Sequence, residues 1–131
     1  MTEQTPDLTT RADGLVVFTC PADGEPLRTE QDALDIIGTA GYSQADIAVI
    51  PTARVDPSMF DLSTRALGEF LQKFVNYRLP VAFVGDISAH VARSEPLRAF
   101  VLESNRGRQV WFLADEDELA ERLDRAAGRA R

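Results

Sequence analysis

The chain has 131 residues, 44% of them hydrophobic and 27% charged, which is typical of one globular domain with its own core. Fourteen Lys and Arg against 21 Asp and Glu give a net charge of −7, which repels phosphate backbones and argues against a nucleic-acid partner. The apolar runs fall far below the ~20 residues of a membrane helix and no basic, apolar leader opens the chain, so we expect a cytoplasmic protein that spans no membrane.

The first predicted elements are two strands joined by a tight turn. Residues 8–11 and 15–20 are extended in pattern and flank Asp13-Gly14, a pair typical of hairpins in which both central residues take positive φ. Residues 1–7 precede the hairpin, and we expect them to be flexible.

A helix, a strand and a second helix follow. The first helix is predicted to begin at Thr29, an N-cap residue with Asp32 three positions on, and to stop at Gly41. Residues 47–50 are apolar at every position and predict a buried strand. The second helix is expected from about residue 60 to residue 78.

The C-terminal half continues the alternation of strands and helices. Residues 79–86, "LPVAFVGD", predict a fourth strand, and Ser94 and Gly107 bound a third helix as cap and stop. "RQVWFLA" predicts a fifth strand. "DEDELAERLDRAAGRAR" predicts a final helix, whose last residues, 128–131, are expected to fray.

Strands that are apolar throughout need cover on both faces, and the intervening helices have the spacing of parallel crossovers. The order β-β-α-β-α-β-α-β-α therefore predicts one α/β domain, residues 8–127, in which a five-stranded, mixed but mainly parallel sheet is flanked by helices.

The second predicted helix has two distinct sides. Its apolar stripe should pack on the sheet, and Gly68 within it suggests a close approach to a strand. The opposite side carries Glu69, Lys73 and Asn76. This polar face is read either as a solvated helix surface or as a binding surface, for a partner or for a second copy of the chain.

Two long strings carry a family resemblance. "GEFLQKFVNYRLPVAFVGDIS" and "LRAFVLESNRGRQVWFLADEDELAERL" resemble the bacterial family known as domain of unknown function 4180, over residues 36–123. The resemblance implies a fold and leaves the biochemical role open.

The element order is also similar to that of the STAS domain of anti-sigma-factor antagonists. In that fold the loop after the third strand docks a partner kinase, and a serine there is phosphorylated in many members. The corresponding segment here is "PTARVDPSMFDLSTRALG", although the Asp-Ser-Ser/Thr-Gly pattern is absent. The resemblance implies these candidate docking or phosphorylation residues: Ser58, Asp61, Ser63, Thr64 and Arg65.

Polar residues also follow the later strands and helices. Asp86 lies at the carboxyl end of the fourth strand, where α/β sheets bind ligands, but "GDIS" also suits a turn. Asn105 is expected to cap its helix. Glu103 is expected to pair either with a neighbouring Arg or with the polar face of the second helix, at Lys73 or Asn76. A pocket of Asp86, Glu103 and Arg65 is the alternative reading, a small-molecule binding or hydrolytic domain.

No catalytic residue, metal site or cofactor is predicted. Cys20 and His90 are the only residues of their kinds, too few for a common zinc site, and no glycine-rich phosphate loop or nucleophile elbow is present. The leading hypothesis is therefore a non-enzymatic, STAS-like regulatory module that docks an unidentified protein partner through residues 54–65.

Overall fold

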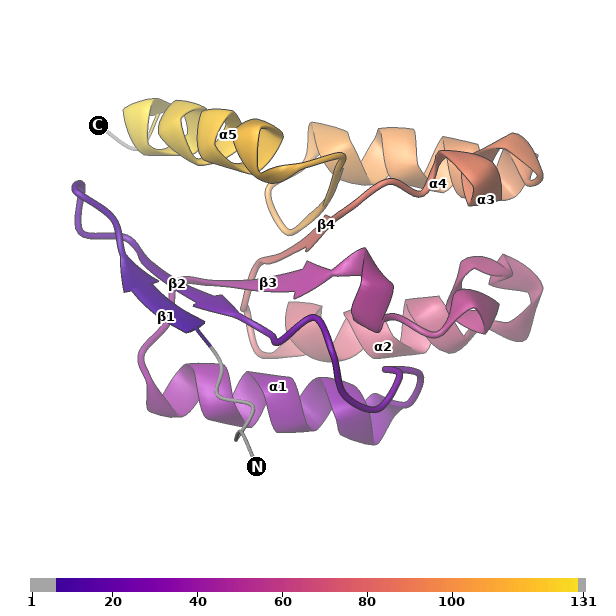
Figure 1. Cartoon of the computed structure of the whole chain (residues 1–131), viewed down its shortest axis with the longest axis horizontal. Helices are drawn as coiled ribbons and strands as arrows, with labels where there is room; N and C mark the ends of the chain where they lie inside the picture. The colour runs from indigo at the N-terminus through magenta and orange to yellow at the C-terminus, as the bar shows by residue number, and fades with distance from the viewer. Residues whose placement is uncertain (1–6, 130–131) are drawn as a thin grey trace.

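The computed structural model describes residues 7–129 and shows a single α/β domain with a five-stranded sheet (Figure 1). The strands lie in the order β1-β2-β3-β4-β5, with β1 and β2 antiparallel and each later pair parallel. The predicted fold class is confirmed. The strands are β1 (Asp7–Thr10), β2 (Val16–Thr19), β3 (Ile47–Pro51), β4 (Val81–Val84) and β5 (Val110–Leu113).

Across residues 7–129 there are five α-helices, one more than the pattern predicts. They are α1 (Glu30–Tyr42), α2 (Ala66–Asn76), α3 (Ser88–Ala92), α4 (Glu95–Arg106) and α5 (Glu116–Arg129). The additional helix is α3, which is too short to show a hydrophobic period. Ser94 caps α4, as predicted, by accepting a hydrogen bond from the Leu97 N–H at 3.2 Å.

The terminal predictions fall mostly outside the described residues. Residues 1–6 and 130–131 lie beyond them, whereas Asp7 already belongs to β1 and residues 128–129 belong to α5. Within residues 7–129, no helix has the length and apolar content needed to cross a membrane.

The β1–β2 hairpin closes through a longer turn than the predicted one. The Gly14 N–H donates to the Arg11 carbonyl at 2.9 Å, and the Arg11 N–H donates to the Leu15 carbonyl at 2.8 Å. Gly14 has a φ of +90°, whereas Asp13 does not take the positive φ that was predicted. The turn is thus a type I turn followed by a left-handed glycine, and Asp13 contributes its carboxylate, which accepts from the Leu15 N–H at 3.1 Å.

Helix α1 begins as predicted and ends later than predicted. Thr29 and Asp32 form a reciprocal capping box, each side chain accepting from the other's backbone N–H. The stop at Gly41 is wrong, because Gly41 lies inside the helix. The chain instead reverses at Gln44, which takes a φ of +58° after Ser43 has capped the helix.

The segment between β3 and α2 differs most from the prediction. Helix α2 begins at Ala66, not near residue 60, and the preceding residues form three short 3-10 helices: η1 (Thr52–Arg54), η2 (Pro57–Phe60) and η3 (Leu62–Thr64). Asp56 and Asp61 explain the difference. Each side chain accepts a hydrogen bond from a backbone N–H two residues on, which favours separate turns over one continuous helix.

Two apolar clusters pack on opposite faces of the sheet. Helices α1, α2 and α4 share the first cluster, with Phe83 and Phe112 pointing toward them, and α5 packs on the second face through Leu119 and Leu123. Because each crossover leads to the next strand along, the three crossover helices lie on one side. Figure 1 shows α1 and α2 on one side of the sheet and α5 on the other. The whole predicted stripe of α2 is buried: Leu67, Phe70, Leu71 and Phe74.

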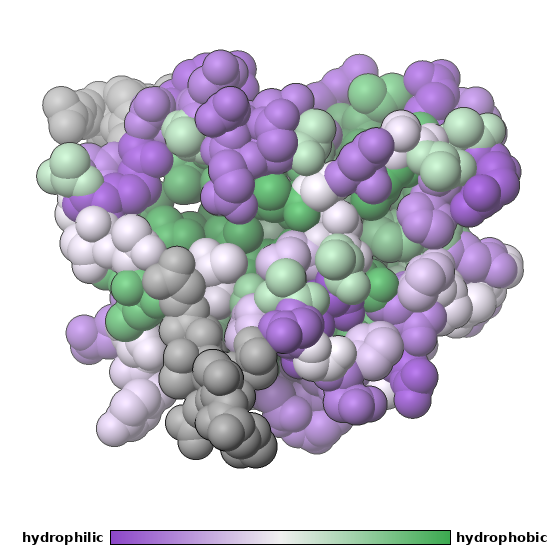
Figure 2. All heavy atoms as spheres, in the orientation of Figure 1, coloured by the Kyte–Doolittle hydropathy of each residue, from purple (hydrophilic) through white to green (hydrophobic). Residues whose placement is uncertain are grey.

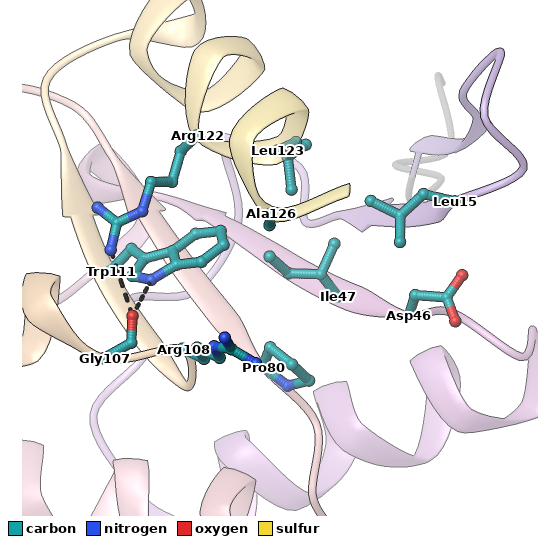
Figure 3. Close-up of a pocket in the computed structure, with 10 residues that line it drawn as sticks. All are labelled: Leu15, Asp46, Ile47, Pro80, Gly107, Arg108, Trp111, Arg122, Leu123 and Ala126. Atoms are coloured by element: carbon teal, nitrogen blue, oxygen red, sulfur yellow. Dashed lines mark hydrogen bonds between the residues drawn. The ribbon is translucent and has the colours of Figure 1, made fainter. Parts of the chain in front are cut away.

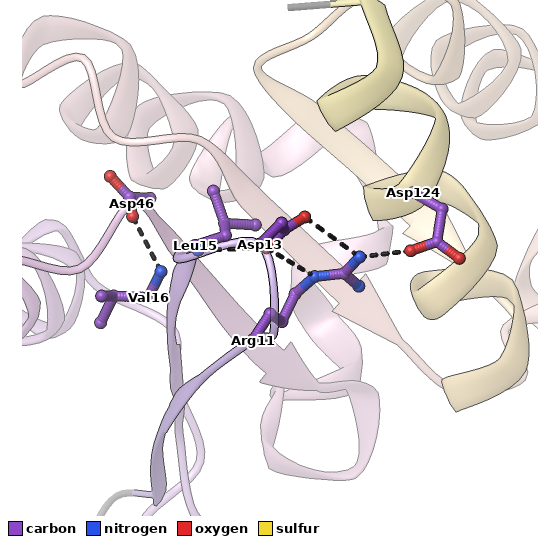
Figure 4. A network of polar contacts seen from close by, with 6 residues as sticks. All are labelled: Arg11, Asp13, Leu15, Val16, Asp46 and Asp124. Carbon is purple, nitrogen blue, oxygen red and sulfur yellow. Dashed lines mark hydrogen bonds and ion pairs between the residues drawn. The ribbon is translucent and has the colours of Figure 1, made fainter.

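An ion-pair cluster joins the hairpin to α5 (Figure 4). The Arg11 guanidinium lies between the Asp13 carboxylate, at 3.4 Å, and the Asp124 carboxylate of α5. Nearby, Asp46 accepts a hydrogen bond from the Val16 N–H at 2.8 Å, which ties the start of β3 to β2. Exposed ion pairs contribute little to the free energy of unfolding. The role of this cluster is therefore positional, because it links the hairpin tip to α5.

Two glycines have opposite surroundings. A Cβ at Gly68 would meet nothing within 4 Å, so the expected close approach of a strand at this position is wrong. At Gly85, after β4, the φ is +147° and a Cβ would lie 1.9 Å from the Thr52 hydroxyl oxygen. Gly85 is therefore needed for the close passage of two strand ends.

Alanine substitutions at these glycines should change stability in opposite directions. Gly68→Ala should raise the free energy of unfolding by about 0.5–1 kcal/mol, because alanine favours a helix and has room here. Gly85→Ala should lower it by about 1–3 kcal/mol through backbone strain and the clash with Thr52. Urea denaturation measures both, and shifts in the same direction would contradict this account.

Candidate functional site

The predicted docking residues lie together on the loop of residues 54–65, hereafter the 54–65 loop, at the carboxyl end of β3. The Ser63 hydroxyl donates to the Asp61 carboxylate at 2.7 Å. The Thr64 hydroxyl donates to the Asp61 carbonyl at 3.0 Å and accepts from the Ala66 N–H at 3.2 Å. These hydroxyls therefore have local hydrogen-bond partners at the loop–helix junction. Ser63 and Thr64 are nevertheless exposed, as are Ser58 and Arg65.

The base of the 54–65 loop is fixed to the rest of the domain. The Leu27 N–H donates to the Arg54 carbonyl at 2.9 Å, and the Asp56 N–H donates to the Leu27 carbonyl at 3.0 Å. The Arg54 guanidinium donates to two backbone carbonyls of the β2–α1 connection. Met59 and Phe60 are buried beneath the exposed hydroxyls. The loop thus presents its polar groups on an anchored backbone.

Arg65 sets the angle between the loop and α2. It takes a left-handed conformation, with a φ of +67°, at the N-cap position, and its side chain makes no capping hydrogen bond. A non-glycine residue in this region costs of order 1–3 kcal/mol, so the surrounding structure must hold it there. The strained residue turns the chain sharply between the exposed loop and the packed helix.

The carboxyl ends of the strands do not assemble the alternative pocket. Asp86 is exposed, and its carboxylate accepts a hydrogen bond from the Ser88 N–H at 2.8 Å. This contact agrees with the prediction that "GDIS" forms a turn. It lines a hollow of about 400 Å³ together with His90, whose ring stacks on Phe60 with centroids 4.7 Å apart. Glu103 lines a different hollow, between α2 and α4, so Asp86 and Glu103 do not share a site.

The carboxylates of this region are firmly ionised. The pKa values of Asp56, Asp61 and Asp86 are all lowered, because hydrogen bonds favour the charged form. In each case the main hydrogen-bond donor is the serine two residues further along the chain. At Asp56 and Asp86 the largest effect comes from the backbone N–H of that serine, and at Asp61 it comes from the serine hydroxyl. A carboxyl group that donates a proton near neutral pH needs the opposite shift.

Cys20 behaves as a small apolar residue. Burial raises the pKa of its thiol to about 11, and the charge of Arg54 offsets this only in part. A protonated thiol is a poor nucleophile and a poor metal ligand. In the described part of the chain, no three His, Cys, Asp or Glu side chains are grouped to hold a metal ion.

The polar face of α2 is partly used inside the molecule. Lys73 pairs with Glu30 of α1 at 3.1 Å and so links two helices. Asn76 accepts a hydrogen bond from Gln72 at 2.9 Å, and Glu69 is exposed. Of the two partners predicted for Glu103, a neighbouring arginine is confirmed, because Glu103 pairs with Arg106 on its own helix at 3.4 Å.

The prediction that Asn105 caps α4 is wrong. Its side chain instead binds the backbone of the edge strand β5. Its side-chain amide donates to the Phe112 carbonyl at 3.1 Å and accepts from the Phe112 N–H at 2.7 Å. Beside it, the Arg122 guanidinium bonds to the carbonyls of Asn105 and Gly107 and lies 4.6 Å from the centre of the Trp111 ring. Sequence reasoning missed Arg122, since no local pattern relates it to residues of β5.

Comparison with known protein families finds a match over most of the chain. The model of the family described as domain of unknown function, DUF4180, matches residues 12–123. Neither a curated protein nor a solved structure matches the chain, and the STAS resemblance therefore stays a prediction.

The lowered pKa of Asp61 predicts how the 54–65 loop responds to acid. The hydrogen bonds from Ser63 favour the carboxylate, so their stabilising effect is complete above the ordinary aspartate pKa of about 3.9 and is lost as the pH falls through the lower folded value. The Ser63 amide NMR shift should therefore titrate with a midpoint below about 3.9. Asp61→Asn should remove this titration, and a midpoint above the ordinary value would contradict the account.

Proposed function

The chain belongs to the DUF4180 family, a domain of unknown function, and from its surface we propose that it is a non-enzymatic module that docks a protein partner through the 54–65 loop. The DUF4180 resemblance seen in the sequence is confirmed, and the match begins earlier than residue 36. Because the family carries no assigned activity, the proposal rests on the loop itself.

The observation that carries the proposal is an anchored loop with exposed hydroxyls. Ser58, Ser63 and Thr64 are exposed to solvent. Met59 and Phe60, which lie between Ser58 and Ser63 in the sequence, are buried. A loop that is already ordered loses little conformational entropy when a partner binds. Such a surface suits recognition of a folded partner better than it suits chemistry on a bound substrate.

Phosphorylation of this loop would act as a release signal. The Ser63 hydroxyl lies 2.7 Å from the Asp61 carboxylate, so a phosphate on Ser63 would place two negative groups together and break the turn. In this proposal the unmodified loop is the form that binds. The same repulsion makes an aspartate at Ser63 a usable mimic.

The alternative, a small-molecule or hydrolytic site at the strand ends, has weaker support. Asp86 is committed to a turn and its pKa is lowered, and Glu103 lies in another hollow. A homodimer through the polar face of α2 is likewise less favoured, because Lys73 already pairs with Glu30.

Charge substitutions in the 54–65 loop should separate binding from folding. We expect Ser63→Asp and Thr64→Asp to lose a protein that the unaltered chain captures from lysate of its source organism, identified by mass spectrometry. The melting temperature should change little, since both side chains are exposed.

Thr39→Asp is the matched control. Thr39 is an exposed residue of α1 whose hydroxyl donates to a backbone carbonyl at 3.0 Å, as that of Thr64 does, but it lies outside the loop. It should retain the partner. Equal capture by all the variants would refute docking through residues 54–65.

A further inference from the structure

A cavity of about 240 Å³ opens on the second face of the sheet, at the end opposite the 54–65 loop (Figure 3). Its walls come from the hairpin tip, the starts of β3 and β5, and the C-terminal half of α5. The apolar part of its lining consists mainly of Leu15, Ile47, Pro80, Trp111 and Leu123. No proposal made above uses this cavity.

The cavity exists because this face of the sheet has little cover. Among the described residues, α5 is the only helix whose side chains join the second apolar cluster. Figure 2 shows a patch of apolar atoms exposed below α5. The Arg11–Asp124 ion pair links the hairpin tip to α5, so these two walls of the cavity lie side by side (Figure 4). A concave, mostly apolar hollow with a few polar groups at its rim is a typical small-molecule site.

The charged groups at the rim are unequally engaged. Arg122 is committed to the carbonyl of Gly107 and to the face of Trp111. Arg108 lines the cavity beside Pro80, is exposed, and makes no hydrogen bond or ion pair with any residue in the range 7–129. Figure 3 shows Arg108 and Pro80 at one end of the cavity and Asp46 at the other. An anionic group is therefore favoured at the Arg108 end alone.

We propose that this cavity binds a small amphipathic carboxylate, with its apolar body over Ile47 and Trp111 and its carboxylate on the Arg108 guanidinium. A planar guanidinium matches a carboxylate through two parallel hydrogen bonds. A phosphate is disfavoured, because the α5 segment at the cavity is the C-terminal half of the helix, which offers no free amides to an anion.

The volume limits the size of the ligand. A cavity of roughly 150 Å³ accommodates benzene, so the space here suits a molecule of about ten non-hydrogen atoms. Octanoate has this size and combines a flexible apolar chain with one carboxylate. Octan-1-ol has the same chain without the charge and serves as its uncharged counterpart.

Trp111 provides a direct readout, because it is the chain's single tryptophan and it lines the cavity. Titration of the full-length protein with octanoate, below its micelle concentration, should change the tryptophan fluorescence to saturation. Arg108→Gln should weaken octanoate binding by about tenfold or more, the usual effect of losing a hydrogen bond to a charged group. Octan-1-ol should bind more weakly than octanoate and should not respond to Arg108→Gln.

Two further variants keep the test decisive. Arg106→Gln removes a neighbouring exposed arginine that pairs with Glu103 and does not line the cavity, so it should leave octanoate affinity unchanged. Ala126→Phe places a ring at an exposed lining position, and it should abolish binding while the urea midpoint stays near that of the unaltered chain.

Three results would overturn the proposal. The first is an unchanged Trp111 fluorescence at all octanoate concentrations. The second is equal affinity for octanoate and octan-1-ol together with no effect of Arg108→Gln. The third is self-association in sedimentation that Ala126→Phe abolishes and octanoate does not affect, which would assign the cavity to a second copy of the chain.

Discussion

The structure depends on covering a sheet whose central strands are apolar on both faces. Ile47 to Ile50 of β3 and Val81 to Val84 of β4 are all buried, so neither face of these strands can be left to water. Sequential parallel crossovers place α1, α2 and α4 on one face, and within residues 7–129 only α5 and the hairpin tip cover the other. This unequal cover accounts for the position of the apolar cavity.

The two proposed surfaces lie at opposite ends of the strands. The 54–65 loop follows the carboxyl end of β3, whereas the cavity is lined by Asp46 and Ile47 at the amino end of the same strand. A partner on the loop would therefore not block the cavity. The two functions can be tested separately, and a single rigid strand, β3, connects their positions.

Aspartates illustrate how the same residue type can suggest chemistry and provide structure. Asp56, Asp61 and Asp86 all follow strands or turns at the carboxyl edge of the sheet. Carboxylates at this edge are candidates for ligand binding or catalysis, because α/β sheets commonly bind ligands there. In each case a backbone N–H two residues on bonds to the carboxylate and lowers its pKa. These residues shape the exposed turns, and their lowered pKa values disfavour proton donation near neutral pH.

Local sequence determined the elements that depend on neighbours in the chain. Continuous apolar runs predicted β3 and β4, the Thr29–Asp32 spacing predicted the start of α1, and the apolar stripe of α2 predicted its buried side. The residues proposed for docking were taken from the resemblance to the STAS domain, and they lie within one segment of the chain. What tertiary structure alone decided are contacts between distant residues: Lys73 with Glu30, Asn105 with the β5 backbone, and Arg122 with Trp111. The packing of the helices on the sheet determines which of these residues meet. It also determines the cavity, because residues from several elements line it and no single element carries a sequence pattern that predicts it.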